Sequence, residues 1–437
     1  MMRFILPLML ALAALPARAA LEIKEVTSPG GITAWLVEDH SIPFTALEIR
    51  FRGGASVEPM DKRGATNLMT ALLEEGAGDL DARAFARARD GLAASFRYSV
   101  SDDALSVSAQ FLTENREAAV DLLRQSLIAP RFDPEAIERV RAQVLSGLRS
   151  DDKDPQSIAS RRFDALVFGD HPYGSSLDGT IETVSALTRD DLIAAHAATL
   201  ARDRIYVSAV GDITAEALGA MLDDLLGDLP LTGAEMPGPA DPAFPGGVEV
   251  VEFPTPQSVV LFGQPAIGQD HPDFFAAFIL DHILGGGGFE SRLMTEVREK
   301  RGLTYGIYTY LADREFAQFW GGSVASANNR VAEAVTVISA EWARLQAEGV
   351  SAEELENAKT YLTGAYPLRF DGNGTIANII VGMQMRGLPI DYAATRNDKV
   401  NAVTLEDVNR VARELLNPDA LSFVVVGQPD GLMETSN

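Results

Sequence analysis

Apolar and polar positions alternate along residues 47–52, where Leu47, Ile49 and Phe51 are separated by charged side chains. A period of two is typical of a strand in a sheet with one solvated face, and residues 104–111 repeat it less regularly. These segments therefore predict strands that bury one face and leave the charged side chains of residues 47–52 in water.

The spacing becomes helical after Asp133. Asp133 and Pro134 are the N-cap and first residue that helices prefer. Apolar residues then recur three or four positions apart, at Ile137, Val140, Val144 and Leu148. Because strands occur in groups with helices between them, we predict an α+β fold of mostly antiparallel sheets covered by helices.

The two halves of the chain repeat this pattern. Thr188 and Thr404 each precede a helical segment and then a strand that ends at Gly211 or Gly427, and both pairs are 216 positions apart. Other helix starts are 214 and 218 positions apart, at Asn115 and Asn329 and at Asp133 and Ser351. A duplicated unit of about 200 residues explains these offsets.

A linker is predicted between the repeats. Nine of the eighteen residues from 230 to 247 are proline or glycine, and such a segment continues neither a helix nor a central strand. We therefore expect two homologous modules, an N-terminal one at 20–229 and a C-terminal one at 248–437, joined by residues 230–247.

The first nineteen residues have the pattern of a secretory signal peptide. Arg3 is followed by the apolar residues 4–15, by Pro16 and by a small-residue site that ends at Ala19. The alternative is a membrane anchor, but the apolar run is short of the roughly 20 residues that span a bilayer. We expect cleavage after Ala19, no membrane insertion, and a periplasmic or secreted protein.

The amino-acid composition limits which catalytic mechanisms and partners are possible. The chain has no cysteine, which excludes disulfides and thiolate chemistry. Its 62 acidic and 37 basic residues give a net charge of -25, so no nucleic-acid partner is expected. Any histidine-based mechanism must use the five histidines at positions 40, 171, 196, 271 and 282.

Residues 64–76, GATNLMTALLEEG, resemble the frame of the pitrilysin/insulinase (inverzincin) metallopeptidases. Active members carry H-x-x-E-H there: two histidines one helical turn apart bind zinc, and the glutamate activates the zinc-bound water. The matching residues are Asn67, Thr70 and Ala71, and the family's third ligand, a glutamate on a later helix, falls at Gly147. The resemblance implies a degenerate metal site, with no cofactor bound by this chain.

The remaining histidines offer no replacement site. His271 and His282, interpreted as lying on one helix, would be about 16 Å apart along its axis. Zinc ligands lie about 2 Å from the metal, so the two cannot share one ion. We expect His271 to cap a helix or lie in a loop, His282 to be partly buried, and His171 to lie in a structural turn.

Residues 283–305 carry the best-preserved part of the resemblance. The family places an arginine and a tyrosine, seven positions apart, next to the substrate, and here they are Arg298 and Tyr305. A guanidinium can donate to a peptide carbonyl and a phenol to a developing oxyanion. The preceding glycines are expected to form a loop that approaches the peptide: Gly285, Gly286, Gly287 and Gly288. A P-loop is the alternative, but its G-K-[ST] ending is missing.

The resemblance implies a LuxS/metallohydrolase-like duplicated fold and a specific role. The chain would be the zinc-less, substrate-binding subunit of an exported heterodimeric metalloendopeptidase, inactive alone and paired with a homologous zinc-bearing chain that acts on peptides. The alternative is a non-catalytic scaffold or peptide-holding protein of the same fold. No constellation supports an autonomous serine or carboxylate hydrolase.

Overall fold

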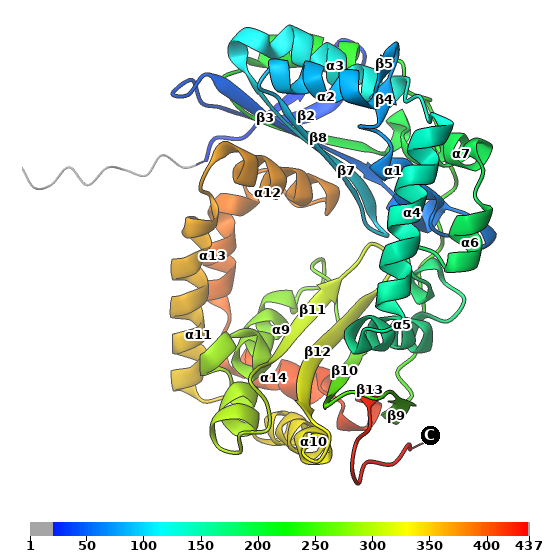
Figure 1. Cartoon of the computed structure of the whole chain (residues 1–437). Helices are drawn as coiled ribbons and strands as arrows, with labels where there is room; N and C mark the ends of the chain where they lie inside the picture. Colours follow the sequence, from blue (N-terminus) through cyan, green and yellow to red (C-terminus); the bar gives the residue numbers. More distant parts are fainter. Residues whose placement is uncertain (1–20, 436–437) are drawn as a thin grey trace, which may run out of the picture.

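The computed structural model describes residues 21–435, so the predicted signal peptide at 1–19 lies outside the described residues. Two sheets, one in each half of the chain, dominate the molecule (Figure 1). We call residues 21–229 the N-terminal half and residues 248–435 the C-terminal half. No helix within the described part is long and apolar enough to cross a membrane.

The sheet of the N-terminal half has six strands in the order β1-β2-β8-β3-β7-β6. Only the β2–β8 pair is parallel. The strands are β1 (Lys24–Thr27), β2 (Thr33–Glu38), β3 (Phe44–Arg52), β6 (Ser95–Val100), β7 (Ala104–Leu112) and β8 (Ile205–Gly211), and a separate small hairpin pairs β4 (Gly76–Ala77) with β5 (Leu80–Asp81).

The sheet of the C-terminal half has five strands in the order β11-β12-β10-β13-β9. Only β13 and β9 run parallel. The strands are β9 (Gly247–Glu252), β10 (Gln257–Pro265), β11 (Ile307–Asp313), β12 (Gln318–Ala327) and β13 (Ser422–Gly427). Apart from β1, the two sheets have the same order and the same single parallel pair, so the predicted α+β fold and its duplication are confirmed.

Helices pack around both sheets (Figure 1). Those of the N-terminal half are α1 (Ala65–Ala71), α2 (Ala82–Gly91), α3 (Arg116–Ile128), α4 (Pro134–Asp151), α5 (Pro155–Phe168), α6 (Ile181–Ala186), α7 (Arg189–Thr199) and α8 (Ala215–Leu226). Those of the C-terminal half are α9 (Phe274–Asp281), α10 (Val331–Glu348), α11 (Ala352–Ala365), α12 (Asn373–Met385), α13 (Tyr392–Ala402) and α14 (Leu405–Leu415). Thr188 and Thr404 both form capping boxes, as expected of repeated helix starts.

The two halves exchange one helix. In Figure 1, α12 lies against the sheet of the N-terminal half and α5 against the sheet of the C-terminal half. Ile380 of α12 joins a core with Trp35 and Val210, while Phe163 of α5 joins one with Phe319. The exchanged helices begin 218 positions apart, the offset of the repeat, so each is the counterpart of the other.

The exchange corrects one prediction. The charged face of residues 47–52 is not solvated throughout, because Glu48 is only 7% exposed. Its carboxylate accepts a hydrogen bond from Ser108 Oγ at 2.9 Å, and burial raises its pKa above the usual value. The covering element is α12, which contacts β3 but begins at Asn373, more than 300 positions further along the chain, so local alternation could not reveal it.

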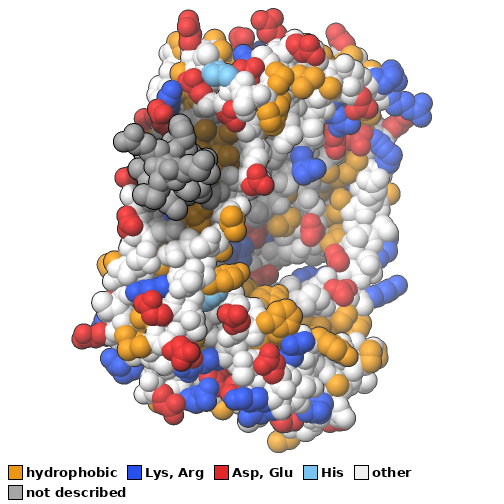
Figure 2. Space-filling model, turned by 90° about the vertical axis from the view of Figure 1, so that its left-hand side faces the viewer, with side chains coloured by type: hydrophobic (Ala, Val, Ile, Leu, Met, Phe, Trp, Pro, Cys, Tyr) orange, Lys and Arg blue, Asp and Glu red, His pale blue; other side chains and the backbone are white. Residues whose placement is uncertain are grey.

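Equivalent hairpin turns join the two halves on one side. The β6–β7 turn supplies Asp102, which pairs with Arg314 of the β11–β12 turn. Asp103 accepts the hydroxyl of Tyr173 and the backbone N–H of Glu315. The Arg314 guanidinium also lies 3.6 Å from the centre of the Tyr173 ring. Figure 2 shows the molecule hollowed between its halves.

Candidate functional site

The helix of the degenerate zinc frame, α1, is held by buried charges. Gly64 precedes it with φ at 95°, a conformation that favours glycine. Glu58 accepts the backbone N–H groups of Gly64 at 3.0 Å and Thr66 at 2.8 Å, which satisfies the helix start. Arg63, 2% exposed, pairs with Glu58 and Asp102. The helix is therefore fixed without a metal.

The residues in the metal-ligand positions have other contacts. Asn67 Nδ2 donates to Asp178 Oδ1 at 2.8 Å, and Thr70 Oγ1 donates to its own helix at Thr66 O at 2.7 Å. Ala71 is exposed and offers only a methyl group. Gly147 lies on α4, which packs against α1.

This donor set does not fit zinc, which takes imidazole, thiolate or carboxylate ligands. Asn67 and Thr70 offer an amide and a hydroxyl already bonded, and the other two positions offer no donor atom. Within residues 21–435, no group of three or more histidine, aspartate or glutamate side chains could hold a metal ion. We therefore derive no catalytic step through a metal on this chain.

The histidines are dispersed among structural contacts. His171 lies in a turn and its Nδ1 accepts the backbone N–H of Tyr173 at 3.2 Å, while His282 is half-buried and stacks on Tyr361. The expected helix containing both His271 and His282 was wrong, because α9 begins only at Phe274. His271 instead precedes it, and its Nδ1 accepts the N–H of Asp273 at 3.1 Å.

The glycine-rich segment also differs from the expected loop. Gly285 and Gly286 belong to a π-helical turn, His282–Gly286, that continues α9. A Cβ at Gly285 would lie 2.5 Å from Thr309 Oγ1, and one at Gly286 would lie 2.6 Å from Asp281 Oδ2. Only Gly288, with φ at 62°, is exposed with nothing near its Cβ position. The first two glycines are needed for packing.

Arg298 and Tyr305 lie on the surface that follows this segment. Arg298 is in the π-helical turn Met294–Glu299, and its guanidinium lies 4.9 Å from the centre of the Phe289 ring. Tyr305 is 90% exposed, just before β11. Within the part of the chain that the structure describes, neither side chain is held by a hydrogen bond or an ion pair, so both can donate to a ligand.

Two residues beside this pair were missed from the sequence. Tyr308 and Tyr310 are 54% and 42% exposed and lie on one face of β11, the edge strand of its sheet. Their alternation in residues 305–311 was the available signal. The Tyr308 and Tyr310 ring centres are 6.3 Å apart, and Arg298 lies over the Phe289 ring. We call these four residues and Tyr305 the aromatic surface; exposed rings of this kind can bind an extended peptide through ring contacts.

Fold and site together define a class of duplicated α+β proteins. They keep the helix on which a related metallopeptidase would carry its zinc ligands, but the residues at those positions cannot bind zinc. Residues 34–181 match the family model described as insulinase (peptidase family M16), and residues 186–362 match the model described as peptidase M16 inactive domain. The chain belongs to this insulinase/pitrilysin family.

Relatives in sequence and a solved structure match this chain over nearly its whole length. A Helicobacter pylori protein named non-peptidase homolog YmxG is 26% identical, over 89% of this chain and 90% of that protein. An uncharacterized zinc protease of Mycobacterium leprae is 28% identical, over 90% of this chain and 89% of that protein. The crystal structure of a peptidase M16 inactive domain from Pseudomonas fluorescens matches with a TM-score of 0.88 and 27% identity, covering 95% of this chain and all of that one.

Proposed function

We propose that this chain is the zinc-less, substrate-binding subunit of an exported heterodimeric metalloendopeptidase. A homologous zinc-bearing chain would supply the metal, the attacking water and the general base. This chain would supply Arg298 and Tyr305, which orient the peptide and stabilise its oxyanion, and the accessible backbone from Gly286 to Gly288. The expected role of Gly285 is indirect, because it is buried beneath the segment.

The observation that carries the proposal is that the pair forms no hydrogen bond or ion pair among the described residues. Tyr305 is 90% exposed, and the Arg298 guanidinium lies over the face of the Phe289 ring, so the N–H and O–H donors of both side chains are available to a ligand. Such donors stabilise a tetrahedral intermediate when the oxyanion forms within about 3 Å of them. Since the zinc positions of the same chain hold no ligands, the reacting centre must come from elsewhere.

The proposal includes the predicted organisation and location. The modules would be residues 20–229 and 248–437, joined by the linker at 230–247, in which the structure has no helix or strand before Gly247. Cleavage after Ala19 would deliver the chain to the periplasm or the exterior, where a cysteine-free protein escapes thiol oxidation.

A second candidate is a non-catalytic scaffold or peptide-holding protein. The name of the Helicobacter relative, a non-peptidase homolog, favours it. The aromatic surface around Tyr305 would then hold a peptide without contributing to its cleavage. The two candidates differ in whether adding the chain changes a turnover rate or only an affinity.

Reconstitution tests the proposal. The purified chain is mixed with each H-x-x-E-H homologue encoded in the same genome, peptide cleavage is followed, and zinc is measured on each separated chain. We expect one mixture to cleave peptides faster than either chain alone, with zinc on the partner only. Cleavage that never exceeds that of the partner alone would contradict the subunit role and favour the scaffold.

A further inference from the structure

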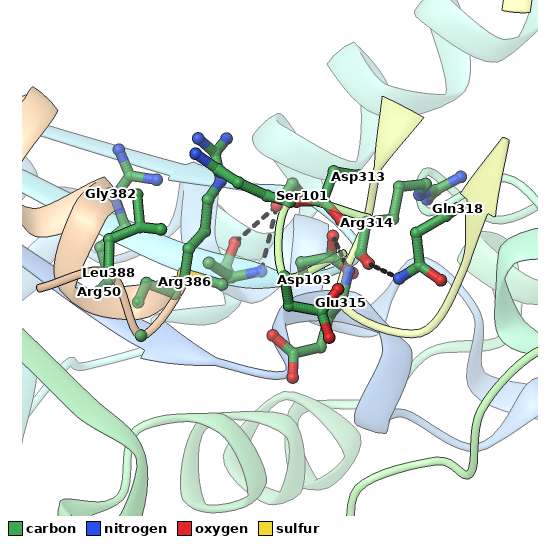
Figure 3. A pocket seen from close by; sticks show the side chains of 15 residues that line it. Arg50, Ser101, Asp103, Asp313, Arg314, Glu315, Gln318, Gly382, Arg386 and Leu388 are labelled. Atoms are coloured by element: carbon green, nitrogen blue, oxygen red, sulfur yellow. Dashed lines mark hydrogen bonds between the residues drawn. The ribbon is translucent and has the colours of Figure 1, made fainter. Parts of the chain in front are cut away.

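A crevice between the two halves is separate from the surface around Tyr305. It has a volume of about 480 Å³ and opens beside the two joined hairpin turns. Figure 3 shows its walls: Arg50 from β3, Arg386 from the loop after α12, and Asp313 and Glu315 from the end of β11 and the following turn. This size is within the range of small-ligand sites, roughly 300–1,000 Å³.

Two guanidinium groups in the crevice form no ion pair with a carboxylate among the described residues. Arg50 Nη2 donates to Asn378 Oδ1 at 2.5 Å, while its buried Nε has no hydrogen-bond acceptor among the described residues. Arg386 is exposed, and within residues 21–435 it forms no ion pair. Burial lowers the pKa of Arg50 below its usual value; the charge of Glu48 opposes this shift, and the charge of Arg386 adds to it. Neighbouring cations of this kind attract an anionic group.

The other wall carries two carboxylates, Asp313 and Asp270, that form no ion pair among the described residues. Asp313 is half-buried, and burial raises its pKa. A backbone hydrogen bond from Gln269 and the charge of Arg386 oppose this shift, while the charge of Asp270, which also lines the crevice, adds to it. The other two acidic residues of the lining are already engaged: Asp103 binds Tyr173 and Glu315 binds Arg52. The groups left for a ligand are therefore two cations and two anions.

We infer that this crevice binds the free ends of a short peptide, with its carboxylate at Arg50 and Arg386 and its ammonium at Asp313 and Asp270. A simple anion such as phosphate would be repelled by the two aspartates, and a simple cation would be repelled by the two arginines. A zwitterion satisfies both walls. The site lies within this chain and requires neither a partner nor the Arg298–Tyr305 pair.

Calorimetric titration of the purified chain with trialanine tests the site. Arg386→Gln should weaken binding roughly tenfold, the effect of losing one charge-assisted hydrogen bond, whereas Arg413→Gln, an exposed arginine on α14, should not change it. Trialanine amide brings no carboxylate to either arginine, so it should bind the native chain at least as weakly as trialanine binds Arg386→Gln. Equal binding of trialanine and its amide, or equal competition by acetate or inorganic phosphate, would overturn the inference.

A second variant reports on the opposite wall. The native chain should prefer trialanine to N-acetyl-trialanine, because the acetylated end brings no charge. Asp313→Asn should lose that preference, because the ammonium group then no longer meets the Asp313 carboxylate. An unchanged preference would overturn the assignment of the ammonium end. Trialanine binding without any reconstituted cleavage would contradict only the subunit proposal, and reconstitution without trialanine binding would contradict only this inference.

Discussion

At the scale of single residues, the glycine-rich segment depends on one buried acid. Asp281 is 6% exposed, and its Oδ1 accepts hydrogen bonds from Thr309 Oγ1 and Trp320 Nε1, each at 2.7 Å. Burial raises its pKa to about 6. The folded state therefore holds this proton more tightly than the unfolded chain, and ionisation of Asp281 costs stability as the pH rises from about 4 to about 6.

Asp281→Asn should remove that cost. The amide oxygen can accept both hydrogen bonds, so the variant should be more stable than the native chain by about 1–3 kcal/mol at pH 8 and similar to it near pH 4. Urea unfolding at both pH values measures the difference. Asp398→Asn, at an exposed position of α13, is the control. A variant less stable than the native chain at pH 8 would contradict the account.

The sequence predicts Arg298 and Tyr305 as the substrate-binding pair because the surrounding family frame is intact, and that assignment stays a prediction. The sequence could not show that Gly285 and Gly286 are helical, because that conformation depends on Asp281 and Thr309, which lie 28 positions apart in the chain. Nor could it show that the Tyr305 ring lies free of the core. Both features follow from tertiary packing.

At the scale of secondary-structure elements, the exchange of α5 and α12 ties the halves together. The repeat offsets predicted other pairs of helices, such as those that begin after Asp133 and Ser351, but the sequence analysis identified neither α5 nor α12. The offsets could not predict the exchange, since an apolar helix face does not specify which of two similar sheets it covers. Ser208 Oγ of β8 donates to Ala377 O of α12 at 2.7 Å, and Gln384 Oε1 accepts the N–H of Val207 at 3.0 Å. These two hydrogen bonds fix the position of α12 on β8, which apolar contacts alone would not specify.

Truncating either exchanged helix should destabilise the chain. Ile380→Ala should cost about 2–5 kcal/mol and Phe163→Ala about 3–5 kcal/mol, because both side chains are buried and each leaves a cavity. Leu368→Ala, at a side chain 70% exposed, should stay within about 0.5 kcal/mol of the native chain. Denaturant unfolding measures all three. If the free energy of unfolding falls by less than about 1 kcal/mol in both Ile380→Ala and Phe163→Ala, the exchanged helices contribute little to the stability of the chain.

At the scale of the whole molecule, the exchanged helices and the joined hairpin turns make the two halves interdependent. A specific protease site inserted after Leu231, an exposed residue, should allow cleavage between them. The fragments should still elute together in native buffer and separate only in denaturant, because each holds a helix that the other buries. Gel filtration tests this, and fragments that separate without denaturant would contradict the arrangement.

The central claim is that this chain completes a reacting centre that lies on a second chain. Its most direct test is the turnover number of the reconstituted mixture with native chain or with Tyr305→Phe, and Tyr361→Phe, another exposed tyrosine, is the control. We predict a fall of about 100-fold for Tyr305→Phe, the effect of losing an oxyanion donor, with unchanged thermal stability and full activity for the control. A mixture whose turnover is the same with Tyr305→Phe as with the native chain would contradict the claim.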